Sequence, residues 1–182
     1  MARDVNLPNL LTVVRIFLVP LFVYLLVYDY TRWALGVFVV AGLTDAMDGA
    51  IARMWHQQTT LGRYLDPLAD KMLLTAAFVA LAVRSWIPFW VLIIIVSRDI
   101  ILLIGTVVMH LTQGGFDINP SLLGKTTTFL QLVLVVLALV MVTGLGAVPY
   151  FDHAVWIVAV VTVISGLHYL YRGIRRMNGN VV

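Results

Sequence analysis

The chain has 182 residues, 62% of them hydrophobic, and its mean hydropathy is +0.99. Soluble domains are closer to half apolar, and one soluble core of this size cannot hide so much apolar surface. The formal charge of +3 is too small to indicate a nucleic-acid partner, and the absence of cysteine excludes a disulfide framework. We therefore expect a single-domain membrane protein over residues 1–182, with lipid as its main solvent.

Six apolar stretches predict membrane-spanning helices, because a span needs about 20 mostly apolar residues. Turn-forming residues separate the six stretches, which cover 10–28, 34–54, 66–83, 87–110, 122–144 and 153–171. Residues 2–9 form a short polar segment that we expect to lie at the membrane interface. The predicted fold is all-α, with six transmembrane helices and no internal repeat or second domain.

Basic residues near the predicted helix ends indicate the orientation in the membrane, because cytoplasmic loops carry an excess of Lys and Arg. If the N-terminus lies inside, the outer loops hold only Arg32 and Arg84. The inner side then holds Arg3, Arg53, Arg63, Lys125, Arg172, Arg175 and Arg176. We expect a multi-pass protein of the cell (inner or plasma) membrane with both termini in the cytoplasm.

Several charged residues fall inside the predicted spans, where one charge near the bilayer centre costs about 3 kcal/mol. They are Arg15, Asp45, Asp48, Asp66, Asp70, Lys71, Arg98 and Asp99. In the orientation above, nearly all of them lie in the cytoplasmic half. They are expected to face a shared interior, which predicts one cavity open to the cytoplasm.

Four aspartates dominate this set. Asp45 and Asp48 are three residues apart and Asp66 and Asp70 are four apart, so each pair shares a helix face. A short connection predicts that the second and third helices are antiparallel neighbours, which lets all four carboxylates converge. Protonation or bound cations would relieve their repulsion. All-oxygen ligands suit Mg²⁺ or Mn²⁺, with Ca²⁺ an alternative, and two such ions serve in-line displacement at phosphorus.

The residues around the aspartates complete a longer pattern: Asp45-x2-Asp48-Gly49-x2-Ala52-Arg53-x8-Gly62-x3-Asp66-x3-Asp70. These eight fixed residues over 26 positions resemble the signature of the CDP-alcohol phosphatidyltransferase family. The predicted six-span layout is similar to that family along the whole chain. The resemblance implies a membrane enzyme that transfers a phosphatidyl group from CDP-diacylglycerol to an alcohol and releases CMP. It also implies a homodimer.

The resemblance further implies roles for individual residues. Asp45, Asp48 and Asp66 would hold the two divalent cations, and Asp70 would lie near one metal and act as the general base. The positions expected around the donor cytidine and diphosphate are Gly49, Ala52, Arg53 and Gly62, with Asn9 and Thr12 on the donor side. The positions expected near the acceptor are Arg15, Arg98, Lys125 and Thr128.

The nature of the acceptor rests on two cations, Arg98 and Lys125, in the same half of the predicted cavity. Asp99 follows Arg98, and neighbours on a helix point about 100° apart, so we expect Asp99 not to neutralise Arg98. Two cations favour an anionic acceptor, with glycerol 3-phosphate first. Phosphatidylglycerophosphate synthases more usually carry Glu at the position of Asp99. The Arg-Asp pair and the tail from His168 to Arg172 resemble eukaryotic-type cardiolipin synthases, so phosphatidylglycerol is the alternative acceptor. Inositol phosphate or another alcohol is a third.

Other interpretations of these residues stay open. Intramembrane aspartates also occur in cation or proton transporters, although many transporters show paired halves that this sequence lacks. Arg53 can extend to the interface as a simple helix-end cation, and Lys125 can be a positive-inside anchor. Arg15 and Arg98 can each be structural partners of an aspartate. Asn9 and Thr12 can serve only as a helix start.

Overall fold

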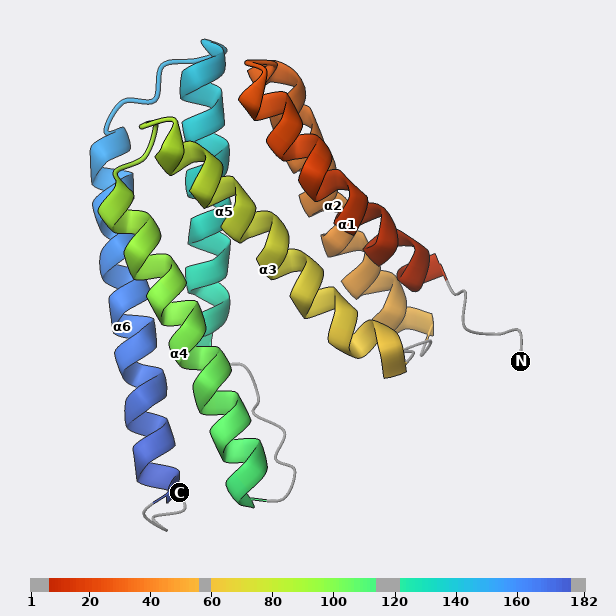
Figure 1. Ribbon diagram of the computed structural model, residues 1–182, viewed down its shortest axis with the longest axis vertical. Helices are drawn as coiled ribbons and strands as arrows, with labels where there is room; N and C mark the ends of the chain where they lie inside the picture. The colour runs from red at the N-terminus through yellow and green to blue at the C-terminus, as the bar shows by residue number, and fades with distance from the viewer. Residues whose placement is uncertain (1–6, 56–59, 114–121, 178–182) are drawn as a thin grey trace. The chain divides into compact units, whose positions relative to one another are not determined.

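The computed structural model describes residues 7–55, 60–113 and 122–177, and side chains within 14–44, 71–108 and 122–175. These described residues form six helices (Figure 1): α1 (Leu7–Val27), α2 (Thr31–Trp55), α3 (Thr60–Val83), α4 (Phe89–Gln113), α5 (Leu122–Thr143) and α6 (Phe151–Met177). The prediction of six helices is confirmed. The largest differences are at α3, which begins six residues before the predicted span, and at α6, which ends six residues beyond it.

Length and apolar composition mark this as a multi-pass membrane protein. Three helical stretches in the described part of the chain are long and apolar enough to span a bilayer: Phe89–Val108, Leu122–Thr143 and Phe151–Arg175. Shorter apolar stretches cover Val14–Val27, Thr31–Thr44 and Lys71–Val83. In α2 the charged motif residues follow the apolar stretch, and in α3 they precede it. The apolar stretch of each of these helices is therefore shorter than the helix itself. Crossing by all six helices, and the interfacial position of residues 2–9, stay predictions.

The helices fall into two compact units, the first of residues 1–86 and 135–148 and the second of residues 87–134 and 149–182. In the first unit α1 packs against both α2 and α3 (Figure 1). The buried rings of Phe22 on α1 and Phe38 on α2 lie 5.5 Å apart, and Phe78 and Leu81 of α3 are also fully buried. Aromatic and aliphatic burial therefore holds this three-helix group together.

Arg84 ties the end of α3 to the end of α1. Its Nη2 atom donates hydrogen bonds to the carbonyl oxygens of Leu26 and Val27, the latter at 2.9 Å, and it lies 2.7 Å from Asp29 Oδ1. A helix leaves its last carbonyl groups without intrahelical partners, so a cation placed there stabilises the helix end. Because both C-terminal ends meet at Arg84, α1 and α3 run in the same direction.

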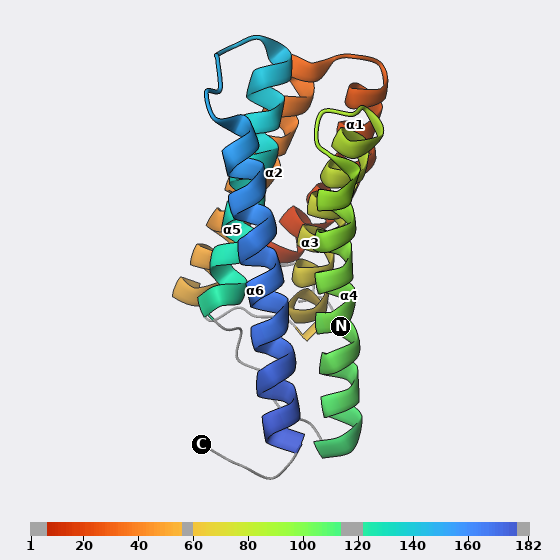
Figure 2. The ribbon, with the colours of Figure 1, turned by 90° about the vertical axis from the view of Figure 1, so that its left-hand side faces the viewer.

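The second unit is built on the pairing of α4 with α6, which lie side by side in Figure 2. Near the start of both helices the rings of Trp90 and Trp156 are 4.7 Å apart. Towards their ends the hydroxyl of Tyr169 is 2.9 Å from Thr106 Oγ1. Contacts that advance together along both sequences mean that α4 and α6 are parallel. The buried side chain of Gln131 joins α5 to α6 through a hydrogen bond to Thr162 Oγ1 at 3.2 Å.

Candidate active site

The aspartate pattern lies on helical backbone. Asp45 and Asp48 belong to the C-terminal half of α2, and Asp66 and Asp70 to the N-terminal half of α3. Helical spacing places each pair on one face of its helix. The side chains of all four aspartates lie outside the described residues, so their convergence on one point stays a prediction.

The predicted donor-side residues also fall on helices whose side chains are not described. Asn9 and Thr12 belong to α1, and the other positions to α2 and α3: Gly49, Ala52, Arg53 and Gly62. Their side chains lie outside the described residues as well. Among the described side chains, no group of three or more His, Cys, Asp or Glu can hold a metal ion. The four aspartates remain the candidate ligands, and carboxylate oxygens are the donors that hard divalent cations prefer.

Arg15 is a buried cation of the first unit. It lies on α1, and only 1% of its surface is exposed. A charged side chain that turns inward in a membrane protein marks a polar interior or a binding site. Its predicted place near the acceptor and the alternative structural pairing with Asp45 or Asp48 both stay predictions.

Arg98 is a buried cation of the second unit, and its contacts correct one expectation. Arg98 Nη1 donates to Asp99 Oδ1 at 2.7 Å, so the expectation that Asp99 leaves this charge uncompensated is wrong. Successive Cβ atoms do point about 100° apart on a helix, but the long arginine side chain bends back to its neighbour. The positive charge of Arg98 is therefore already offset by an adjacent carboxylate.

The environment of Arg98 comes from α6. Its Nη2 atom lies 3.4 Å from Ser165 Oγ, while Nε has no hydrogen-bond partner among the described residues. A Cβ at Gly166 would be 3.5 Å from Arg98 Cγ, an ordinary van der Waals contact, so this part of α6 lies directly beside the arginine side chain. Ser165 was not predicted from the sequence. The signal for it is the adjacent pair of small residues, Ser165 and Gly166, since small residues mark close helix contacts in membranes.

The other two predicted acceptor residues, Lys125 and Thr128, are exposed near the start of α5. Thr128 Oγ1 donates to the carbonyl oxygen of Gly124 at 3.2 Å, which is a local helix contact. Both residues belong with Arg98 to the second unit, whereas the aspartate pattern belongs to the first. The single cavity that unites them stays a prediction.

Comparison with known proteins identifies the family. A family model described as CDP-alcohol phosphatidyltransferase matches residues 5–167. The chain belongs to the CDP-alcohol phosphatidyltransferase family. It is therefore a membrane enzyme of phospholipid biosynthesis that transfers a phosphatidyl group from CDP-diacylglycerol to an alcohol. The transporter interpretation is set aside.

Similar family members differ in the acceptor that their names give. A CDP-diacylglycerol–glycerol-3-phosphate 3-phosphatidyltransferase of Bacillus subtilis is 33% identical, over 90% of this chain and 93% of its own. A probable phosphatidylglycerophosphate synthase of Mycobacterium tuberculosis is 33% identical, over 98% and 86%. The human CMP-forming cardiolipin synthase is 36% identical over 82% of this chain, which spans 52% of the human protein.

Proposed function

We propose that this enzyme transfers the phosphatidyl group of CDP-diacylglycerol to a terminal hydroxyl of glycerol 3-phosphate, which yields phosphatidylglycerophosphate and CMP. The choice of acceptor rests on how much of this chain, and of each relative, the alignments cover. The B. subtilis and M. tuberculosis relatives named for this product align with 90% and 98% of this chain and with 93% and 86% of their own.

The motif residues account for the chemistry at phosphorus. Asp45, Asp48, Asp66 and Asp70 would hold two divalent cations, Mg²⁺ or Mn²⁺, which when bound supply positive charge against the donor diphosphate. Asp70 accepts the proton of the acceptor hydroxyl, whose oxygen attacks the phosphorus that bears diacylglycerol. The bond from that phosphorus to the CMP oxygen breaks, and CMP leaves with the electron pair. Arg53 is suited to grip the diphosphate.

Arg98 is the proposed anchor of the acceptor phosphate. It is buried, and its Nε atom has no hydrogen-bond partner among the described residues, which leaves a donor for an anionic ligand. Lys125, Thr128 and Arg15 are proposed to assist. Because Asp99 already offsets the charge of Arg98, the electrostatic preference for a doubly charged acceptor is weaker than two uncompensated cations would give.

That same ion pair favours a second candidate acceptor, phosphatidylglycerol, with cardiolipin as the product. A phosphodiester carries one negative charge, which suits an arginine already paired with a carboxylate. The human relative named cardiolipin synthase has a slightly higher identity, 36%, over a shorter part of this chain, 82%. Both acceptors present the same reacting group, a free primary hydroxyl on a glycerol that carries a phosphate.

A direct assay tests the reaction and separates the acceptors. Purified protein in detergent micelles receives CDP-diacylglycerol with Mg²⁺ or Mn²⁺ and, in parallel, glycerol 3-phosphate, phosphatidylglycerol or inositol phosphate. We expect CMP release and phosphatidylglycerophosphate in the first reaction. Cardiolipin from the second reaction alone would establish the second candidate. No CMP release with any acceptor, from folded protein, would contradict the proposed function.

We also propose that the active-site cavity opens to the cytoplasm, that both termini lie there and that the protein forms homodimers. The chain contains no cysteine. A single cysteine introduced near either terminus or in the loop after α1 is therefore the one thiol of the protein that a reagent can label. A membrane-impermeant thiol reagent applied to intact cells should label the Tyr30→Cys variant but neither terminus. Labelling of the termini would contradict the orientation, and a monomer mass in detergent would contradict the dimer.

A further inference from the structure

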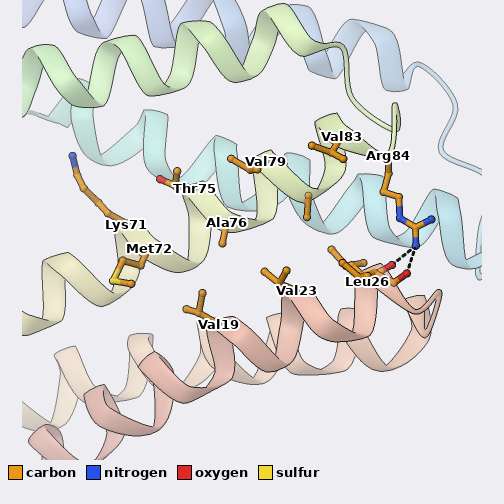
Figure 3. Close-up of a pocket in the computed structure, with 12 residues that line it drawn as sticks. Val19, Val23, Leu26, Lys71, Met72, Thr75, Ala76, Val79, Val83 and Arg84 are labelled. Atoms are coloured by element: carbon orange, nitrogen blue, oxygen red, sulfur yellow. Dashed lines mark hydrogen bonds between the residues drawn. The ribbon is translucent and has the colours of Figure 1, made fainter.

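An apolar groove of about 610 Å³ runs along the first unit between α1 and α3. Figure 3 shows the side chains that line it, with those of Val19, Val23 and Leu26 on α1 turned towards α3. On α3 the apolar lining residues are Met72, Ala76, Val79, Ala80 and Val83. Nothing in the sequence analysis predicted this groove.

Small side chains create the hollow. Ala76 and Ala80 lie one turn apart on the same face of α3, where a larger residue would fill the space against α1. Opposite them, Val19 and Val23 are also one turn apart and present short branched side chains. The result is a trough along two parallel helices and not an isolated hole. Its shape suits a long, thin, apolar ligand.

The two ends of the groove differ chemically. One end is at Lys71, the residue directly after Asp70 of the aspartate pattern. The other end is at Arg84, whose guanidinium is bound to Asp29 and to carbonyl oxygens at the end of α1. Lys71 and Arg84 are thirteen residues apart, which corresponds to about 20 Å along a helix. One leaflet contributes about 15 Å of hydrocarbon, half of a 30 Å core.

We infer that this groove holds one acyl chain of CDP-diacylglycerol during turnover; the inference rests on the proposed function. The phosphorus under attack carries the diacylglycerol, so the chains must enter an apolar space close to Asp70. The groove begins one residue after Asp70 and continues for about 20 Å, which exceeds the roughly 15 Å of hydrocarbon in one leaflet and so gives room for a whole acyl chain. Its lining offers hydrocarbon a continuous apolar surface, whereas water there would lack hydrogen-bond partners. Arg84 closes the far end and limits the chain length that fits.

The test narrows the groove near its closed end. The Ala80→Leu variant adds bulk one turn before Arg84, and Ala154→Leu makes the same change at another half-buried alanine, on α6 and outside the groove lining. The kcat/KM is measured with a dilauroyl and a dioleoyl CDP-diacylglycerol in mixed micelles. We expect Ala80→Leu to lower the ratio of dioleoyl to dilauroyl kcat/KM about tenfold, as overpacking of a filled site does. Ala154→Leu should leave that ratio unchanged.

The outcomes separate the inference from the proposed function. If wild-type protein turns over both donors and the ratio stays constant in Ala80→Leu, the groove does not hold the donor chain and instead faces bilayer lipid. If wild-type protein releases no CMP from either donor, the proposed function itself fails. The milder Ala76→Val variant provides the same readout should Ala80→Leu not fold, and a constant ratio there overturns the inference equally.

Discussion

Replacing Gly105 of α4 with alanine places a methyl group against Tyr169 of α6. The added Cβ would lie 2.7 Å from the Cε1 atom of Tyr169, and 3.4 Å from its hydroxyl oxygen. Carbon atoms in favourable contact are about 3.5–4.0 Å apart, so one of the two groups must move by about 1 Å. The tyrosine ring is held in place, because its hydroxyl is 2.9 Å from Thr106 Oγ1.

The cost of this substitution can be worked out from those contacts. Overpacking a filled contact costs about 1–3 kcal/mol, and displacing the ring also weakens a hydrogen bond worth about 1 kcal/mol. In a helix interior alanine is about 1 kcal/mol more stabilising than glycine, which offsets part of this loss. We therefore expect the free energy of unfolding of Gly105→Ala to fall by about 2 kcal/mol.

Denaturant unfolding in detergent, followed by tryptophan fluorescence, measures this change because Trp90 and Trp156 report on the contact between α4 and α6. Gly36→Ala on α2 is the matched control, since no atom lies within 4 Å of its added Cβ. The control should be neutral or more stable by up to about 1 kcal/mol. Equal stabilities of the two variants would refute the proposed close contact of α4 with α6.

Four further substitutions and the removal of divalent cations test the site and the fold. Asp70→Asn should abolish CMP release while leaving thermal unfolding in detergent unchanged; wild-type turnover would exclude the base role. Removal of divalent cations with a chelator should stop turnover, and added Mg²⁺ or Mn²⁺ should restore it, whereas full activity in chelator would exclude the cations. Asp99→Asn should lower the KM for glycerol 3-phosphate more than that for phosphatidylglycerol, because it frees the charge of Arg98; equal changes would argue against contact between Arg98 and the acceptor phosphate. Arg84→Ala should destabilise the protein by about 1–3 kcal/mol, because the Val27 carbonyl loses the Arg84 donor and the Leu26 carbonyl keeps only the backbone N–H of Asp29. Asp29→Asn should cost less than about 1 kcal/mol, and equal losses would contradict the capping role.

The six helices were predictable because apolar length is a strong signal in a membrane protein. Their ends were not, since hydropathy marks the part of a helix suited to lipid, while backbone hydrogen bonding continues into polar sequence. The helix that carries Asp66 therefore begins at Thr60, six residues before its predicted span. The family was also predictable, because the fixed spacing from Asp45 to Asp70 is specific enough to indicate the family without other evidence.

Contacts that depend on side-chain conformation could not be predicted from the sequence. The pairing of Arg98 with Asp99 contradicts a prediction based on Cβ directions, which ignores the torsions of a long side chain. The closeness of Ser165 to Arg98 depends on the register of two helices that lie far apart along the chain. The groove depends on alanines facing valines across two helices, and hydropathy scores both residue types as apolar. Residue spacing along one helix could be interpreted from the sequence, whereas side-chain torsions and contacts between helices could not.

The bond from Arg84 to the end of α1 also has a consequence for the order in which the protein is assembled. The guanidinium and the Val27 carbonyl that it caps are separated by 57 residues along the chain. The ribosome therefore synthesises the carbonyl well before the arginine that donates a hydrogen bond to it. Until the third helix has left the translocation machinery, that carbonyl must rely on water or lipid headgroups. The capped form of this helix end can therefore exist only in a chain whose third helix has already been synthesised and has packed against the first.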